Sequence, residues 1–165
     1  MSDEHFVHSS HREILIEHLF VGEVLKCLWL KGVFDVEVLK SETDQAGYDV
    51  ILEVGKIVRH VQLKASHQNA TASSQKLNIN LMNKPSGCVV WVVFNKETLQ
   101  LGPFMWFGEL PGKPLKDISE YPVAKHTKGN SHGTKAERPN IRKINKGGFE
   151  KLNSIEDVVN KLFGI

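Results

Sequence analysis

Three side chains in the first half of the chain have the types and spacing of a metal and phosphate site. Asp49 opens an apolar run, Gln62 and Lys64 stand inside the next run, and Gly55-Lys56 supplies the turn between them. Because side chains alternate along a strand, Gln62 and Lys64 project to the same face. A carboxylate, a carboxamide and an ammonium group can therefore converge on one edge of a small sheet.

A fourth candidate, Glu17, lies on an expected helix that begins near Ser9 or Ser10, where Ser10 and Glu13 resemble a capping box, and that ends at Gly32. At 100° per residue, Glu17 falls in the middle of the densest apolar stripe, which consists of Phe20, Val21, Val24, Leu25 and Leu28. A carboxylate on such a stripe is costly unless it is paired or binds a cation. Either Glu17 belongs to the site, or it pairs with Arg12 or His18 at the protein edge.

The expected elements follow the order helix, strand, strand, strand, helix, strand. The strands are predicted over 33–39, 48–54, 57–64 and 88–94, and the last of these is a near-continuous apolar run typical of a central buried strand. A polar loop over 65–74 precedes a short helix, capped by Ser73 or Ser74, through Leu77, Leu81 and Met82. The alternation of Leu77, Ile79 and Leu81 leaves a strand as the alternative.

The sequence changes character after a further strand over 99–106, which is interrupted at Gly102-Pro103. From 107 onwards Gly and Pro break regular elements, and 125–148 is expected to be irregular unless Ile141, Ile144 and Phe149 hold it to the body. Between 125 and 151 there are eight basic and two acidic residues, a net charge of +6, against −4 for the rest of the chain. A terminal helix begins at Ser154, with Asp157 completing a capping box.

The order of elements, together with Glu17, Asp49 and Gln62-Leu63-Lys64, resembles the PD-(D/E)xK nuclease superfamily. Its active site has a Glu from the first helix, an Asp opening one strand and a (D/E)xK tripeptide on the next. The resemblance covers residues 10 to about 94, and the stretches 17–23, 47–50 and 60–66 look like a small bacterial family with a Gln-x-Lys variant of the motif. The chain departs from the pattern in having Tyr48 in place of Pro and Gln62 in place of the second acid.

The resemblance implies an α/β (α+β) fold with a restriction-endonuclease-like αβββαβ core, in which a mixed central sheet is flanked by helices. It also implies a metal-dependent DNA endonuclease, of the kind used in phage defence or repair. Mg²⁺ or Mn²⁺ would be held by Asp49, Gln62, the Leu63 carbonyl and Glu17, and Lys64 would orient or deprotonate the attacking water. The basic segment would contact nucleic-acid phosphates through Lys125, His126, Lys128, Arg138, Arg142 and Lys143.

Composition bounds the remaining alternatives. The 165 residues predict one domain, with a core over about 10–106 and an extension over 107–165. We expect a cytoplasmic protein with no membrane partner, no organic cofactor, and two buried thiols, Cys27 and Cys88. Two other functions stay open: a non-catalytic module that binds nucleic acid or a partner protein, and self-association through the apolar 101–107 strand. The sequence does not settle whether it forms a homodimer, or whether Glu23, Asp44 or His60 also line the site.

Overall fold

A mixed six-stranded sheet forms the centre of the molecule. A computed structural model of the chain describes residues 7–43 and 45–165. The sheet has the strand order β1-β2-β3-β5-β6-β9, and its members are β1 (Val36–Lys40), β2 (Val50–Val54), β3 (Ile57–His67), β5 (Gly87–Phe94), β6 (Leu101–Gly108) and β9 (Glu150–Leu152). β3 and β5 pair in parallel and the other neighbours are antiparallel. The prediction of an α+β fold with a mixed central sheet is therefore confirmed.

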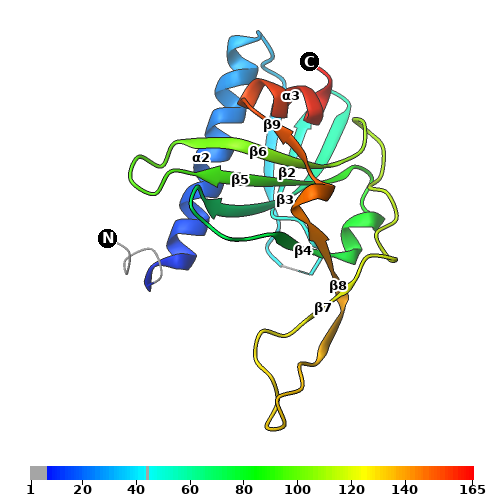
Figure 1. Cartoon of the computed structure of the whole chain (residues 1–165). Helices are drawn as coiled ribbons and strands as arrows, with labels where there is room; N and C mark the ends of the chain where they lie inside the picture. The colour runs from blue at the N-terminus through cyan, green and yellow to red at the C-terminus, as the bar shows by residue number, and fades with distance from the viewer. Residues whose placement is uncertain (1–6, 44) are drawn as a thin grey trace.

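Two helices, α2 (Ser9–Leu30) and α3 (Ile155–Phe163), cover one face of this sheet (Figure 1). Both bury their apolar stripes in one core cluster with Val50, Val61 and Val90 of the sheet. The predicted start and end of α2 are close to those observed, but its capping box is wrong, since His8 occupies the N-cap position without a side-chain hydrogen bond. The box predicted for α3 is confirmed, because the Ser154 hydroxyl accepts a hydrogen bond from the Asp157 amide.

The opposite face is covered by a second, three-stranded sheet with the order β4-β8-β7. It is formed by β4 (Ser74–Asn78), β7 (Val123–Lys125) and β8 (Glu137–Asn145), with short 3-10 helices η1 (Ile79–Asn83) and η2 (Lys146–Gly148) beside it. A second core cluster lies beneath it, and its members include Leu77, Leu81, Trp91, Ile144 and Phe149. The two helices thus lie on one face of the central sheet. The sequence had instead predicted helices flanking the sheet.

The second helix of the predicted core is wrong. Residues 74–78 form β4, which pairs with β8, and only 79–83 turn helically, as η1. The Asn78 side chain starts that turn by accepting a hydrogen bond from the Asn80 amide at 2.9 Å. The alternative, a strand with alternating apolar residues, is correct for residues 74–78, where Leu77 is buried. The strand that pairs with β4 is β8, which lies far away in the sequence.

The basic segment is more regular than predicted. Residues 123–125 and 137–145 form the β7–β8 hairpin, whose outer part, 125–140, is exposed and extends away from the body as an arm (Figure 1). The buried side chains of Ile144 and Phe149 tie it to the second core cluster, as the sequence allowed. Strand formation was missed because the pairing of β8 with β4 is long-range and leaves few apolar residues to mark it.

Much of the apolar 101–107 strand lies inside the molecule. Its last four residues, Phe104–Phe107, are buried, and β6 pairs with β5 on one side and with β9 on the other. Trp91 and Trp106 are also buried, and Cys27 and Cys88 are buried free thiols as predicted. Within the described part of the chain, no helix is long and apolar enough to cross a membrane.

Candidate active site

The candidate site lies in a notch in the central sheet, produced by unequal strand lengths. The pairing of β2 with β3 ends at Val50 opposite Val61, and β1 ends beside it at Lys40. β3 continues to His67 and remains paired with β5 on its other side. The last residues of β3 therefore have no strand next to them where β2 would be, and side chains from both faces of the sheet can reach this edge.

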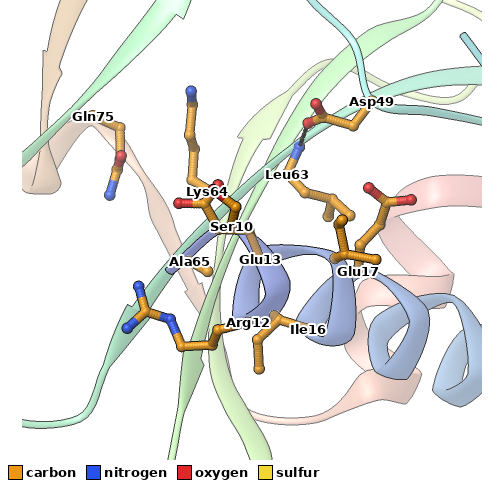
Figure 2. A pocket seen from close by; sticks show the side chains of 11 residues that line it. Ser10, Arg12, Glu13, Ile16, Glu17, Asp49, Leu63, Lys64, Ala65 and Gln75 are labelled. Atoms are coloured by element: carbon orange, nitrogen blue, oxygen red, sulfur yellow. Dashed lines mark hydrogen bonds between the residues drawn. The ribbon is translucent and has the colours of Figure 1, made fainter. Parts of the chain in front are cut away.

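A cleft of about 540 Å³ occupies the notch. Its walls come from the first half of α2, from the residue before β2, from the exposed edge of β3 and from β4; the residues that line it are Ser10, Arg12, Glu13, Ile14, Ile16, Glu17, Asp49, Leu63, Lys64, Ala65 and Gln75. Figure 2 shows Asp49 and Glu17 toward one end of the cleft and Arg12 and Gln75 toward the other. Three of the four predicted catalytic residues, Glu17, Asp49 and Lys64, are thus brought to one cavity.

Asp49 is held by the backbone at the point where the two strands separate. Its amide donates to the Val61 carbonyl at 2.9 Å. One carboxylate oxygen, Oδ2, accepts a hydrogen bond from the Leu63 amide at 2.6 Å. The side chain thereby replaces the missing strand as the partner of that amide, which fixes the carboxylate at the mouth of the notch (Figure 2). Leu63, which was predicted to offer its carbonyl to a metal, contacts Asp49 through its amide.

The loop before Asp49 is anchored by Gly47. This residue is buried with a φ of +78°, and a Cβ atom there would lie 2.8 Å from the Asn78 Cβ atom. Only glycine combines that backbone conformation with so close an approach. The contact holds the Tyr48-Asp49 segment against the start of η1, and so it helps to position the carboxylate.

Glu17 lies at the margin of the apolar stripe and not in its middle. The buried residues of α2 are Ile16, Phe20, Val24, Cys27 and Leu28, and Glu17 is one position round from Ile16. Its side chain is 18% exposed, and Oε1 accepts from the ammonium group of Lys40 at 2.5 Å. The end of β1 brings Lys40 to the carboxylate, a partner that was not among the predicted alternatives Arg12 and His18.

Gln62 is the predicted catalytic residue that does not line the cleft. Its neighbours of the same parity on β3, His60 and Ser66, contact Tyr48 and Trp91 in the layer opposite the helices. Gln62 faces the same way, and so does Lys64, which lines the cleft because it lies farther along the open edge of β3. Its side chain is only 8% exposed, and its Oε1 atom has no hydrogen-bond partner among the described residues. A buried acceptor without a donor is costly and is uncommon in folded proteins.

The donor set suits a hard divalent cation held by few protein ligands. In the described part of the chain, no group of three or more His, Cys, Asp or Glu side chains is placed to hold a metal ion. Mg²⁺ is commonly bound by one or two carboxylates, with waters and substrate phosphates completing the shell. Asp49 and Glu17 supply carboxylates from two sides of one cleft, whereas the Gln62 oxygen is buried outside it.

The predicted phosphate contacts fall into two groups. Five of the residues are exposed: Lys125, His126, Lys128, Arg138 and Lys143. All of them except Lys143 belong to the arm. Arg142 instead holds the arm in place, because its guanidinium donates to the Ser119 carbonyl at 3.0 Å and to the Pro139 carbonyl at 2.6 Å. The arm is connected to the wall of the cleft through β8, whose Ile144 pairs with Gln75 of β4.

Sequence reasoning missed Lys40, Glu13 and Gln75. Glu13 is one turn before Glu17, so its place on the same helix face was readable from the sequence. Lys40 and Gln75 depend on strand pairings that no local signal reveals. Of the further candidates, His60 packs edge-on against Tyr48 with ring centroids 4.9 Å apart, Glu23 pairs with Lys26 at 3.5 Å away from the cleft, and Asp44 lies outside the described residues.

Neither a scan against protein-family models nor a search of curated proteins returned a match for this chain.

Proposed function

We propose that the chain is a metal-dependent nuclease that hydrolyses phosphodiester bonds in nucleic acid, with DNA as the expected substrate. The observation that carries the proposal is the cleft in the sheet notch. It brings Glu17, Asp49 and Lys64 together from a helix, a loop and a strand. The order of helix and hairpin that positions them agrees with the nuclease core that the sequence resembles, although β4 and η1 stand where that core has its second helix.

The three residues have complementary roles in this reaction. A divalent cation, when bound, would supply positive charge against the phosphate oxygens and make the attacking water more acidic. Asp49, held in place by the Leu63 amide, and Glu17 are the carboxylates that hold that cation. Lys64 orients the attacking water, or places its charge beside the phosphate oxygens as negative charge develops on them.

The arm supplies the sequence-independent part of binding. Its cations, among them Lys125, Lys128, Lys135 and Arg138, are exposed on an extended hairpin. Such a surface contacts phosphates and releases counterions, which gives an affinity that falls steeply with salt. β8 joins the arm to β4, and β4 carries Gln75 at the wall of the cleft, so the arm and the cleft are connected through one small sheet.

A second candidate function is favoured by Gln62. Where the superfamily motif has an acid, this chain has a carboxamide whose oxygen is buried outside the cleft. The site then has less negative charge to hold a cation. A module that binds nucleic acid through the arm without cutting it would be consistent with every other feature of the site and the arm.

Cleavage of plasmid, linear and single-stranded DNA with Mg²⁺ or Mn²⁺ tests the proposal. Asp49→Asn keeps an acceptor for the Leu63 amide while removing the charge, and we expect it to lower the cleavage rate on the order of a thousandfold. Lys64→Met should lower it on the order of a hundredfold. Salt-dependent DNA binding, which relies on the arm, should be kept by both variants.

Matched controls are Asp35→Asn and Lys31→Met, which are exposed residues outside the cleft. They should cut at the wild-type rate. Wild-type cleavage that survives both site variants would contradict the assignment of the site. Salt-dependent binding without cleavage by any protein would favour the second function, and the absence of both would reject the two together.

A further inference from the structure

Lys40 is the residue of the cleft region that the nuclease mechanism leaves without a role. It is the last residue of β1, lies opposite Val50 in the register, and its ammonium group is 2.5 Å from Glu17 Oε1. The Lys40 side chain is 51% exposed, whereas that of Glu17 is 18% exposed. A half-exposed cation therefore contacts one of the two carboxylates assigned to the metal.

We propose that Lys40 is an exchangeable counter-ion, which occupies Glu17 in the metal-free protein and leaves it when a divalent cation binds. This inference rests on the proposed function, because it assigns Glu17 to the metal. A carboxylate oxygen with an ammonium group at hydrogen-bond distance has its charge compensated, and a metal ion must compete for it. Lys40 thus sets how much divalent cation the site requires.

The geometry favours exchange over a permanent pair. A half-exposed lysine loses little when it returns to water, and such ion pairs contribute at most about a factor of five to an equilibrium. The backbone of β1 holds Lys40 beside the cleft through its pairing with β2, so the ammonium group stays close after release. Glu17, on the rigid helix α2, does not have to move for the exchange.

The test is Mn²⁺ binding by isothermal titration calorimetry, which needs no cleavage. Lys40→Met keeps the aliphatic stem and removes the charge, so the dissociation constant for Mn²⁺ should fall on the order of fivefold. Lys40→Arg keeps a competing cation and should stay within about twofold of wild type. In a Glu17→Gln background, the change Lys40→Met should have no effect, because the shared carboxylate is gone.

Lys26→Met is the matched control, since Lys26 pairs with Glu23 on the same helix away from the cleft at 3.5 Å. It changes net charge equally and should leave Mn²⁺ affinity within about twofold of wild type. An unchanged or weaker affinity in Lys40→Met overturns the inference, as does an equal gain in Lys26→Met, or no Mn²⁺ binding by any protein. Tighter Mn²⁺ binding by Lys40→Met without DNA cleavage would retain the exchange and reject the nuclease.

Discussion

Arg59 and Gln62 lie three positions apart on β3, and both are buried polar side chains, but they differ in how far their polar atoms are hydrogen-bonded. Arg59 is 0% exposed, and its guanidinium donates to the carbonyls of Lys161, Leu162 and Glu109, each at 2.8 Å. Two of these carbonyls belong to the last turn of α3, where backbone acceptors lack helical partners and a positive charge is favourable. Gln62, in contrast, keeps a buried oxygen with no partner among the described residues.

The end of β3 that carries Arg59 has a structural role, whereas the end that carries Gln62 has a functional one. At the Arg59 end, the Nε and Nη2 atoms of the guanidinium donate to three carbonyls and join α3 to the sheet, and the guanidinium lies over the Trp106 ring at 5.3 Å. Its Nη1 atom is buried without a hydrogen-bond partner among the described residues. At the Gln62 end, β2 has stopped, the strand edge is open and charged side chains meet in a cleft. Unmatched polar groups are expected to concentrate where a protein binds something.

The largest effect on stability should come from Arg59→Met. The substitution keeps most of the apolar stem but leaves three carbonyls without their donor, including that of the buried Leu162, so we expect a loss of about 3 kcal/mol in the free energy of unfolding. Urea denaturation measures it. Arg142→Met is a matched control, because Arg142 also donates to backbone carbonyls but is only half-buried, and it should cost about 1 kcal/mol. Equal losses of unfolding free energy in the two variants would contradict the expected difference between a buried and a half-buried arginine.

Gln62→Met should have a much smaller effect, within about 1 kcal/mol of wild type in urea denaturation. Methionine has a similar length, and it removes an acceptor whose burial is not compensated by a hydrogen bond. Gln75→Met, at the cleft edge of β4, is the comparison variant and should change stability by no more than about 0.5 kcal/mol. A loss near that of Arg59→Met would show that the Gln62 amide has a structural role as large as that of the guanidinium.

The smallest effect concerns pH and His60, between the two residues on β3. Burial, followed by the nearby Lys84 charge, lowers the pKa of His60 below its usual 6.5. In the pH range just below 6.5 the unfolded chain therefore takes up a proton that folded His60 resists, and stability falls as the pH falls. His60→Phe keeps an aromatic ring against Tyr48 and should flatten the dependence of unfolding free energy on pH between 7.5 and 5.5. If the slope of unfolding free energy against pH is unchanged in His60→Phe, groups other than His60 cause the pH dependence.

Local patterns predicted the elements whose signals are contained within a few residues. The two helices, the hairpin of β2 and β3 and the buried strand β5 lie close to their expected positions, because apolar periodicity and caps specify them. The failures, β4 and β8, pair across more than sixty positions of the chain. Their residues gain strand structure from each other, and β4 was read as a helix because Ser74 also suits an N-cap.

The candidate site was predictable in its parts and not in its arrangement. Glu17, Asp49 and Lys64 could be singled out because a charged group in an apolar run is unusual. The notch that unites them depends on where β2 begins relative to the end of β3, which is a property of strand register. For the same reason, the sequence could not show that Lys40 contacts Glu17 or that Gln62 is turned away from the cleft.

The strand β8 has a mechanical consequence. It extends from Glu137 at the base of the exposed loop to Ile144 in the second core cluster, with a register shift in its pairing with β7 between Arg138 and Arg142, and it spans at most roughly 24 Å at about 3.4 Å per residue. One end is fixed by the buried Ile144 and the other carries cations into solvent. A strand anchored in this way sets the distance between a ligand bound by the arm and the notch in the central sheet.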